Sequence, residues 1–262
     1  MPTTPPLPPI TYIDTTVALE DLVEALADAP LLAVDTESNS MYVYREQVCL
    51  IQLSTRDKDY IIDPLAIDNL TSFGTLMADD AIEKVFHAAE YDITCLKRDF
   101  DYTFRNLFDT MVAARICGFK SIGLASMLET YAGVRMDKRH QLDNWGARPL
   151  PEDSLIYAQM DTHYLPYLRD ELQQALTTRG HLSEAQEAFE DVCQTPAASP
   201  RGYNPDGFWK VGRPNRLKRR EMMILREVYT VREEIAMETN RPPFKILNNK
   251  ALVAISRRSP NN

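Results

Sequence analysis

Two carboxylates stand one residue apart at the end of an apolar run. Residues 31–38 read LLAVDTES, so Asp35 and Glu37 close a stretch built to be buried. In a strand, side chains at i and i+2 lie on the same face, so these carboxylates would repel each other. Burying them is costly unless a cation or hydrogen-bond donors compensate. No lysine or arginine lies within seven residues on either side, which favours a divalent metal, and all-oxygen ligation suits Mg²⁺ or Mn²⁺ better than zinc.

Three further residues could take part in the same chemistry. Asp92 follows the apolar stretch KVFHA at the start of a helix, where an acid can also simply interact with the helix dipole. Tyr157 and Asp161 in YAQMD lie four residues apart and therefore on one face of a helix, although such pairs are more often plain surface hydrogen bonds. Each feature alone is weak. Their order and spacing together indicate a single site.

The elements that must position these residues follow from hydrophobic periodicity. An apolar stripe predicts a helix over 17–29. A helix over about 70–79 and a short strand at KVFHA come later, after which helices and strands alternate as in an α/β sheet. Between them, three strand signals predict an antiparallel meander over 31–37, 47–55 and 59–63.

The second half of the main domain is predicted to be mostly helical. The segment 109–132 has a helical pattern broken at glycines, and a polar loop over 137–150 follows. That loop is too long for a simple turn, and long loops inside compact domains tend to be functional. A helix then begins at Pro151, restarts at Pro166 and ends at Gly180.

Proline-rich stretches divide the chain. Residues 1–10 read as a disordered lead, since five of the first nine residues are prolines. Residues 195–215 contain four prolines and three glycines and read as a linker. The main domain is therefore expected at 11–194. Residues 216–262 form a helical segment too short for a comfortable core, so we expect a partial second domain. Its apolar stripe consists of Met222, Leu225, Tyr229, Arg232 and Ala236.

The net charge has opposite signs in the main domain and in the C-terminal segment. The net charge of the 262 residues is −9, which argues against nonspecific coating of nucleic acid. Residues 201–262 hold 14 of the 29 basic and 6 of the 38 acidic residues, a net of +8, leaving −17 for the first 200. This division indicates cation binding in one part and polyanion contact in the other. Four scattered cysteines indicate a reducing cytoplasm, and no apolar run suggests a membrane span or signal peptide.

Taken together, the acids and the stretches around them resemble the ribonuclease D family, in the tyrosine-bearing branch of the DEDD 3′-to-5′ exonuclease superfamily. Ile156 stands where the histidine-bearing branch has its histidine. Ala88 stands where many exonucleases of the superfamily have asparagine, although the ribonuclease D pattern also has alanine there. The tail LREVYTVREEIAMETNRPPFKILNNKAL resembles the start of the helicase-and-RNase-D C-terminal (HRDC) domain. Other stretches that carry the resemblance are LIQLS at 50–54, HAAEYD at 87–92, DTMVAARI at 109–116, LASMLETYAGVRMDK at 124–138 and NWGARPL at 144–150.

The resemblance implies an α/β fold: a ribonuclease H-like mixed sheet flanked by helices, followed by a small, apparently truncated, all-helical domain. It also implies two divalent ions, Mg²⁺ or Mn²⁺. Asp35, Glu37 and Asp161 would hold the ion that carries the attacking water. Asp35 would bridge to the second, with Asp92 contributing directly or through water. Tyr157 would orient the water, because a phenol of pKa near 10 is a poor base at neutral pH.

Substrate contacts are expected around these acids. Thr36 would offer its backbone to the terminal nucleotide, and His87 would contact phosphate unless it is structural. Lys138 and Trp145 would either touch substrate or pin the long loop. The second domain begins with basic residues at Lys218. These residues could contact phosphate, or they could simply form an ordinary helix with a basic first turn, and the sequence supports both alternatives equally.

The expected function is a monomeric, cytoplasmic, metal-dependent exoribonuclease. It would release nucleoside 5′-monophosphates from single-stranded 3′ ends of transfer-RNA precursors and small structured RNAs. A DNA 3′ exonuclease of the same fold is the alternative enzyme, because nothing in the sequence unambiguously reads the 2′-hydroxyl. A catalytically silent RNA-binding scaffold is the alternative from another class. Retention of all four acids argues against it, since each is destabilising without a metal.

Overall fold

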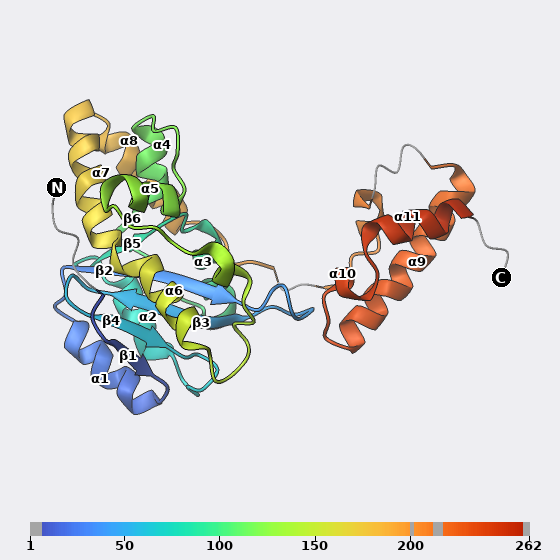
Figure 1. Ribbon diagram of the computed structural model, residues 1–262, viewed down its shortest axis with the longest axis horizontal. Coiled ribbons are helices and arrows are strands. Elements are labelled where there is room, and N and C mark those ends of the chain that lie inside the picture. Colours follow the sequence, from blue (N-terminus) through green and yellow to red (C-terminus); the bar gives the residue numbers. More distant parts are fainter. Residues whose placement is uncertain (1–6, 200–201, 212–216, 259–262) are drawn as a thin grey trace. The chain divides into compact units, whose positions relative to one another are not determined.

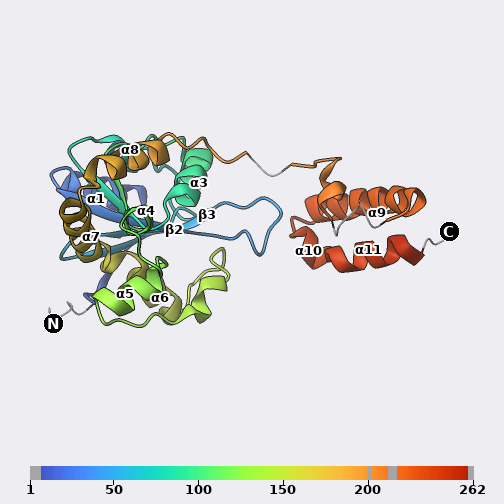
Figure 2. The same ribbon diagram turned by 90° about the horizontal axis from the view of Figure 1, so that it is seen from above.

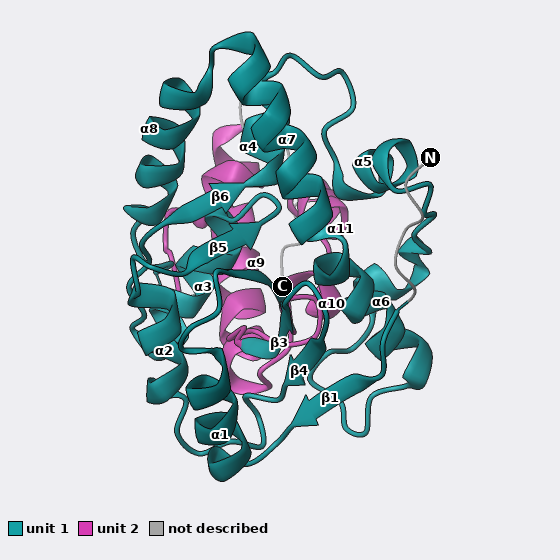
Figure 3. Cartoon of the chain, turned by 90° about the vertical axis from the view of Figure 1, so that its left-hand side faces the viewer, with its two compact units in different colours: residues 1–38, 48–199 teal, residues 39–47, 200–262 magenta. Residues whose placement is uncertain are grey.

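A computed structural model describes residues 7–199, 202–211 and 217–258. The chain divides into two compact units (Figure 3). The first unit contains the chain up to Ser38 and residues 48–199, and the second contains residues 39–47 together with the chain that follows residue 199. The grouping of 39–47 with the C-terminal part was not predicted, because the sequence assigned this loop to the main domain.

A six-stranded mixed sheet forms the centre of the first unit (Figure 1). Its strand order is β1-β4-β3-β2-β5-β6, and the predicted antiparallel meander of β2, β3 and β4 is confirmed. The three remaining pairs of neighbouring strands, β1–β4, β2–β5 and β5–β6, are parallel. The strands span β1 Ile10–Ile13, β2 Leu31–Ser38, β3 Val48–Ser54, β4 Asp59–Ile62, β5 Glu83–Phe86 and β6 Leu107–Asp109.

Strand β1 was not predicted, because four residues beside a proline-rich segment carry little periodic signal. Ile10, assigned by the sequence to a disordered lead, is its first residue and pairs with Asp59. The carbonyl of Pro8 accepts a hydrogen bond of 2.8 Å from Gln159. Residues 1–6 of that predicted lead lie outside the described residues.

Helices cover both faces of the sheet. Figure 2 shows α5 and α6 on one side and α3 and α8 on the other. The predicted restart at Pro166 is confirmed, and α7 ends at Gly180, whose φ of 73° is the left-handed conformation that glycine adopts readily. In this unit the helices span α1 Thr16–Leu26, α2 Thr71–Ala78, α3 Glu90–Phe100, α4 Thr110–Ile116, α5 Leu124–Tyr131, α6 Glu152–His163, α7 Leu165–Arg179 and α8 Leu182–Cys193, with the 3-10 helix η1 at Lys138–Leu142.

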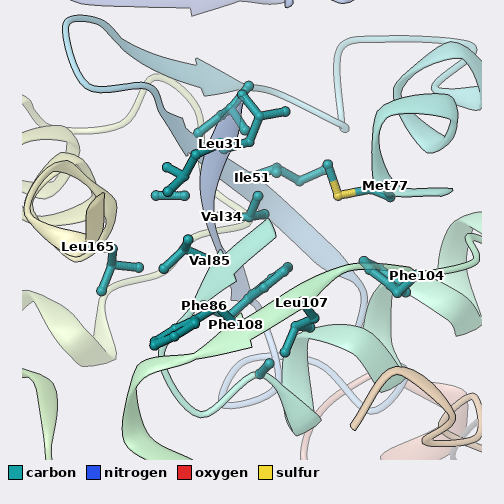
Figure 4. Close-up of a cluster of buried hydrophobic side chains, with 14 of the residues drawn as sticks. Leu31, Val34, Ile51, Met77, Val85, Phe86, Phe104, Leu107, Phe108 and Leu165 are labelled. Carbon is teal, nitrogen blue, oxygen red and sulfur yellow. The ribbon is translucent and has the colours of Figure 1, made fainter. Parts of the chain in front are cut away.

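Because helices cover both faces, the central strands are buried on both sides. Figure 4 shows Leu165 of α7 toward one face of the sheet and Met77 of α2 toward the other. Every residue of β3 is buried, polar ones included. Polar side chains of this strand therefore need partners inside the protein.

The second unit is a small helical cluster. It consists of α9 Arg219–Glu238, α10 Pro243–Ile246 and α11 Asn249–Arg258, preceded by the 3-10 helix η2 Gly207–Lys210. The predicted apolar stripe of α9 is confirmed, since Leu225, Tyr229 and Ala236 are buried. Phe208 and Val211 pack against this stripe, so the predicted linker 195–215 is wrong at these two residues, which belong to the helical core.

The β2–β3 loop is built into this second unit. The side-chain oxygen of Asn240 accepts hydrogen bonds from the backbone N–H groups of Tyr44 and Arg45 at 3.2 and 3.1 Å. The Lys245 ammonium lies 4.1 Å from the centre of the Tyr42 ring, a cation–π contact. The helical unit therefore includes residues 39–47, the loop that connects β2 and β3 of the sheet.

No helix among the described residues combines the length and the apolar character needed to cross a bilayer.

Arg148 fastens the long loop 137–150 to the sheet. Its guanidinium donates to both carboxylate oxygens of Asp63, at 2.6 and 2.7 Å, and to the carbonyls of Cys49 and Trp145, both at 2.7 Å. Asp63 is almost fully buried. A planar guanidinium with five donors is suited to such a bidentate, many-partner contact.

We expect Arg148→Ala to lower the free energy of unfolding by roughly 3–5 kcal/mol, because it leaves the buried Asp63 carboxylate without its charged partner. Urea unfolding would measure this. Arg135→Ala is the matched control, since Arg135 and Glu129 form an exposed ion pair at 3.0 Å that should be worth about 0–1 kcal/mol. Equal losses in the two variants would contradict the assignment.

Candidate active site

The C-terminal half of strand β2 has a neighbouring strand on one side only. The strand pairs with β3 over Ala33–Ser38, but with β5 only over Leu31–Ala33. Asp35 and Glu37 therefore lie where one side of the strand has no neighbouring strand. The register with β3 shifts immediately after Glu37, a β-bulge. Bulges often re-aim side chains beside functional sites.

Helix α6 brings a third carboxylate to this strand end. It packs across β2, β3 and β4. Side-chain oxygens of Asp35, Glu37 and Asp161 all lie within 4.8 Å of one another. Asp161 is buried, and the other two are half-buried. The structure thus gathers three of the four predicted acids into one cluster of oxygen donors.

Asp92 reaches the same strand from α3. Thr36 alternates with the two acids of β2, and its hydroxyl donates to Asp92 Oδ1 at 2.5 Å. Asp92 is not within the 4.8 Å cluster, yet it is the acid that contributes most to raising the pKa of Asp35. The Thr36 side chain therefore positions Asp92, a role that was not predicted. Its proposed backbone contact with substrate stays a prediction.

Asp109 holds the turn that leads into α3. Its carboxylate accepts from the backbone N–H groups of Ala88 and Ala89 at 3.1 and 2.8 Å, and it also caps α4. Ala88 has a φ of 63°, a conformation that favours glycine or asparagine. This explains in backbone terms why asparagine suits the position. Sequence reasoning missed Asp109, although an aspartate directly before a helix is the ordinary cap signal.

Burial and mutual repulsion raise the pKa of every clustered acid. For Glu37, burial followed by Asp161 and Asp92 raises the pKa to about 9. Burial raises the pKa of Asp161 to about 8, with a smaller contribution from Asp92. The pKa of Asp35 also lies well above its usual range, through burial and then Asp92 and Asp161. Such a cluster is stable in its ionised form only with compensating positive charge.

Tyr157 lies one turn before Asp161 and is enclosed by the long loop. Its ring centre is 6.3 Å from those of Trp145 and His140. Burial, then Asp161 and Glu37, raises its pKa above the usual range, so the hydroxyl stays protonated at neutral pH. Trp145 is buried and therefore pins the loop, one of the two predicted alternatives.

The loop also supplies residues that sequence reasoning missed. Asp143 accepts hydrogen bonds from Ser154 Oγ at 2.6 Å and from His140 Nδ1 at 2.8 Å, and its charge contributes to raising the pKa of Glu37. These contacts join the loop to the start of α6. No local pattern marks Asp143, because its partners are defined only when the loop folds over the helix.

A pocket of about 340 Å³ opens beside the acids. Tyr157 and Asp161 line it, together with His87 and Lys138 and residues from α5 and η1. Two of the three predicted substrate contacts thus border one cavity. A larger pocket, about 600 Å³, lies elsewhere around Lys97 and Arg105, away from the acids.

His87 is oriented by a defined chain of hydrogen bonds. The Thr110 hydroxyl donates to the carbonyl of Phe86 at 2.9 Å, so at 2.8 Å it accepts from His87 Nδ1. Burial lowers the pKa of His87 to about 4, so the ring is neutral and Nε2 is an acceptor. A neutral ring provides no positive charge for the predicted phosphate contact, whereas it can accept a hydrogen bond from a hydroxyl.

We expect the metal-free protein to lose stability as pH rises. The folded-state pKa values of Glu37 and Asp161, about 9 and 8, exceed the unfolded values of about 4. The folded state therefore binds these protons more tightly, and that stabilisation is lost progressively as pH rises from about 4, the unfolded pKa, through the folded pKa values of about 8 and 9. Urea unfolding at pH of about 5 and about 9 should differ by at least about 1.4 kcal/mol, the equivalent of one pKa unit.

Mg²⁺ or Mn²⁺ should remove this difference, since a cation stabilises the ionised cluster. Asp161→Asn should flatten the dependence without metal. A metal-free protein equally stable at both pH values would contradict the electrostatic description of the cluster.

The site is a cluster of three carboxylates at the end of a central strand of a mixed α/β sheet, and its oxygen donors are of the kind that hold divalent cations. The sequence profile of the 3′-5′ exonuclease family matches residues 10–177, and the HRDC domain profile matches 221–262. The chain therefore belongs to the 3′-5′ exonuclease family and carries HRDC sequence after the exonuclease domain.

Solved structures confirm the expected ribonuclease H-like fold. The catalytic core of RRP6 from Trypanosoma brucei superposes with a TM-score of 0.88 at 30% identity, covering 100% of this chain and 75% of that one. Escherichia coli RNase D, described as an exoribonuclease involved in structured RNA processing, gives a TM-score of 0.74 at 28% identity. That match covers 97% of this chain and 68% of that one.

Sequence relatives are considerably longer than this chain. An exosome complex component 10 homolog from Caenorhabditis elegans is 34% identical over 96% of this chain and 29% of its own length. A ribonuclease D from Gluconacetobacter diazotrophicus is 32% identical over 95% of this chain and 63% of its own length.

Proposed function

We propose that this protein is a metal-dependent 3′-to-5′ exoribonuclease that releases nucleoside 5′-monophosphates. The observation that carries the proposal is the cluster of Asp35, Glu37 and Asp161, with the protonated Tyr157 hydroxyl on the same helix as Asp161. Relatives named ribonuclease D and exosome complex exonuclease RRP6 support an RNA substrate.

The acids fit a divalent cation on their chemistry. Three carboxylates within 4.8 Å, each with a raised pKa, form an all-oxygen donor set that suits Mg²⁺ or Mn²⁺. Asp35, Glu37 and Asp161 would hold one ion, and Asp35 with Asp92 a second. When bound, such ions acidify water and stabilise charge on the entering and leaving oxygens of a phosphodiester.

Protein side chains would orient the reactants. Tyr157 would donate a hydrogen bond to the attacking water, because its raised pKa makes it a donor and not a base. Lys138 is exposed at the rim of the pocket and would contact a phosphate. His87 also lines this pocket, and its Nε2, an acceptor in the neutral ring, would accept from a ribose hydroxyl.

Substrate class, compartment and assembly complete the proposal. We propose single-stranded 3′ ends of transfer-RNA precursors and small structured RNAs as substrates, a monomeric enzyme, and a cytoplasmic location. The net charge of +8 over residues 201–262 supports contact of the second unit with RNA. The four cysteines lie among the described residues, are buried and form no disulfide, which is compatible with a reducing compartment.

The first test follows a 5′-labelled single-stranded RNA and its DNA counterpart with Mg²⁺, Mn²⁺ or chelator. We expect a metal-dependent ladder that shortens from the 3′ end, lost in Asp35→Asn because the cluster can no longer hold the cation. Faster shortening of DNA would favour the DNA exonuclease. Binding without shortening under either metal would favour the silent scaffold.

Tyr157→Phe removes only the hydroxyl. We expect kcat to fall roughly 10-fold to 100-fold with little change in KM, since a reactant misplaced by about 1 Å can cost about 100-fold. Steady-state kinetics on a short RNA would measure both constants. Tyr164→Phe is the control, because Tyr164 is a buried tyrosine that follows the same helix and does not line the pocket. Similar kcat values for the two variants would argue against a role for the Tyr157 hydroxyl.

A further inference from the structure

A buried glutamine lies opposite the first acid of the cluster. Gln52 of β3 is directly across the ladder from Asp35 of β2 and has no exposed surface. Directly opposed residues of an antiparallel pair project from the same face, with Cβ atoms about 4.5–5.5 Å apart. Gln52 therefore lies on the face that bears the carboxylate of Asp35.

The hydrogen bonds of neighbouring polar residues show that α6 packs on this face of the sheet. Ser54, two residues along β3 from Gln52, hydrogen-bonds to Thr162 of α6 at 2.7 Å. Asp59, opposite Ser54 on β4, accepts from Gln159 of α6 at 2.6 Å. Asp161 comes from the same helix. The buried polar side chains beside Gln52 thus have partners supplied by α6.

Gln52 differs from these neighbours. Among the residues that the structure describes, neither its Nε2 nor its Oε1 has a hydrogen-bond partner. A buried amide without partners destabilises a fold, because its water contacts are lost without replacement. An apolar residue of similar size would suit the metal-free fold better, so folding alone does not account for a glutamine here.

Asp35 provides the complementary group. A carboxylate accepts at about four positions, and a hydrogen bond from the backbone N–H of Thr36, which lowers the pKa of Asp35, occupies one of them. A glutamine side chain is long enough to bridge the separation of an opposed pair. Carboxylates that hold metals are usually fixed by a further hydrogen bond from a neighbouring side chain.

We propose that Gln52 is a positioning residue for the cation site. Its Nε2 donates to the Asp35 carboxylate when a divalent cation is bound, and this hydrogen bond fixes the orientation of the carboxylate. The inference rests on the proposed function, since it assumes that Asp35, Glu37 and Asp161 bind a divalent ion. This role accounts for a buried amide that has no hydrogen-bond partner among the described residues.

Gln52→Met tests this, because methionine matches the length of glutamine without its polar atoms. We expect Mn²⁺ binding, measured by isothermal titration calorimetry on the full chain, to weaken roughly 10-fold to 100-fold, the usual effect of losing such a partner. The melting temperature of the metal-free protein should stay the same or rise, because an unsatisfied buried amide has been removed. A purely structural glutamine would give the opposite pair of results.

Ser54→Ala is the matched control. Ser54 is buried on the same face of the same strand, but its partner Thr162 is not one of the acids. This variant should lower the metal-free melting temperature and leave Mn²⁺ affinity unchanged. Gln52→Leu repeats the test with a different apolar shape.

Two results would overturn the inference: an unchanged Mn²⁺ affinity in both Gln52 variants, or a failure of both variants to fold without metal. If the parent protein itself binds no Mn²⁺, the proposed function fails first, and the two failures are thereby distinguished.

Discussion

Repulsion among carboxylates at the end of β2 is the constraint on which the site depends. Asp35, Glu37 and Asp161 lie within 4.8 Å of one another in half-buried or buried positions, an arrangement that burial and like charge both disfavour. The fold tolerates it because protons or cations can occupy the cluster. The same repulsion that destabilises the metal-free protein would favour binding of the divalent ion that we propose, so the cluster would lower stability in return for function.

The surrounding scaffold holds that unfavourable arrangement rigid. Asp109 fixes the turn before Asp92 with backbone hydrogen bonds, and Thr36 fixes Asp92 itself. Arg148 ties the long loop to Asp63, and the loop encloses Tyr157. Each contact connects elements distant in sequence. These contacts hold Asp92, Tyr157 and the long loop in place around the acids, so the surroundings of the cluster are preorganised.

The two parts of the chain carry opposite net charges. The first 200 residues carry −17 and contain the acids, and residues 201–262 carry +8. An acidic cluster alone repels a polyanion, so a basic unit in the same chain supports substrate capture. The second unit also includes residues 39–47, the direct continuation of the strand that bears Asp35 and Glu37. Asn240 fastens this loop through two backbone hydrogen bonds.

Features governed by short-range periodicity were predictable from the sequence. The period of two in β2 places Asp35 and Glu37 on one face, the period of α6 aligns Tyr157 with Asp161, and Gly180 marks the end of α7. Resemblance supplied the connection between these segments. The neutral tautomer of His87, the cap of Asp109, the burial of Phe208 and the pairing of Gln52 with Asp35 were decided only by the tertiary structure. Local rules act over a few residues, whereas these features depend on strand register and on hydrogen-bond partners that packing brings from distant parts of the chain.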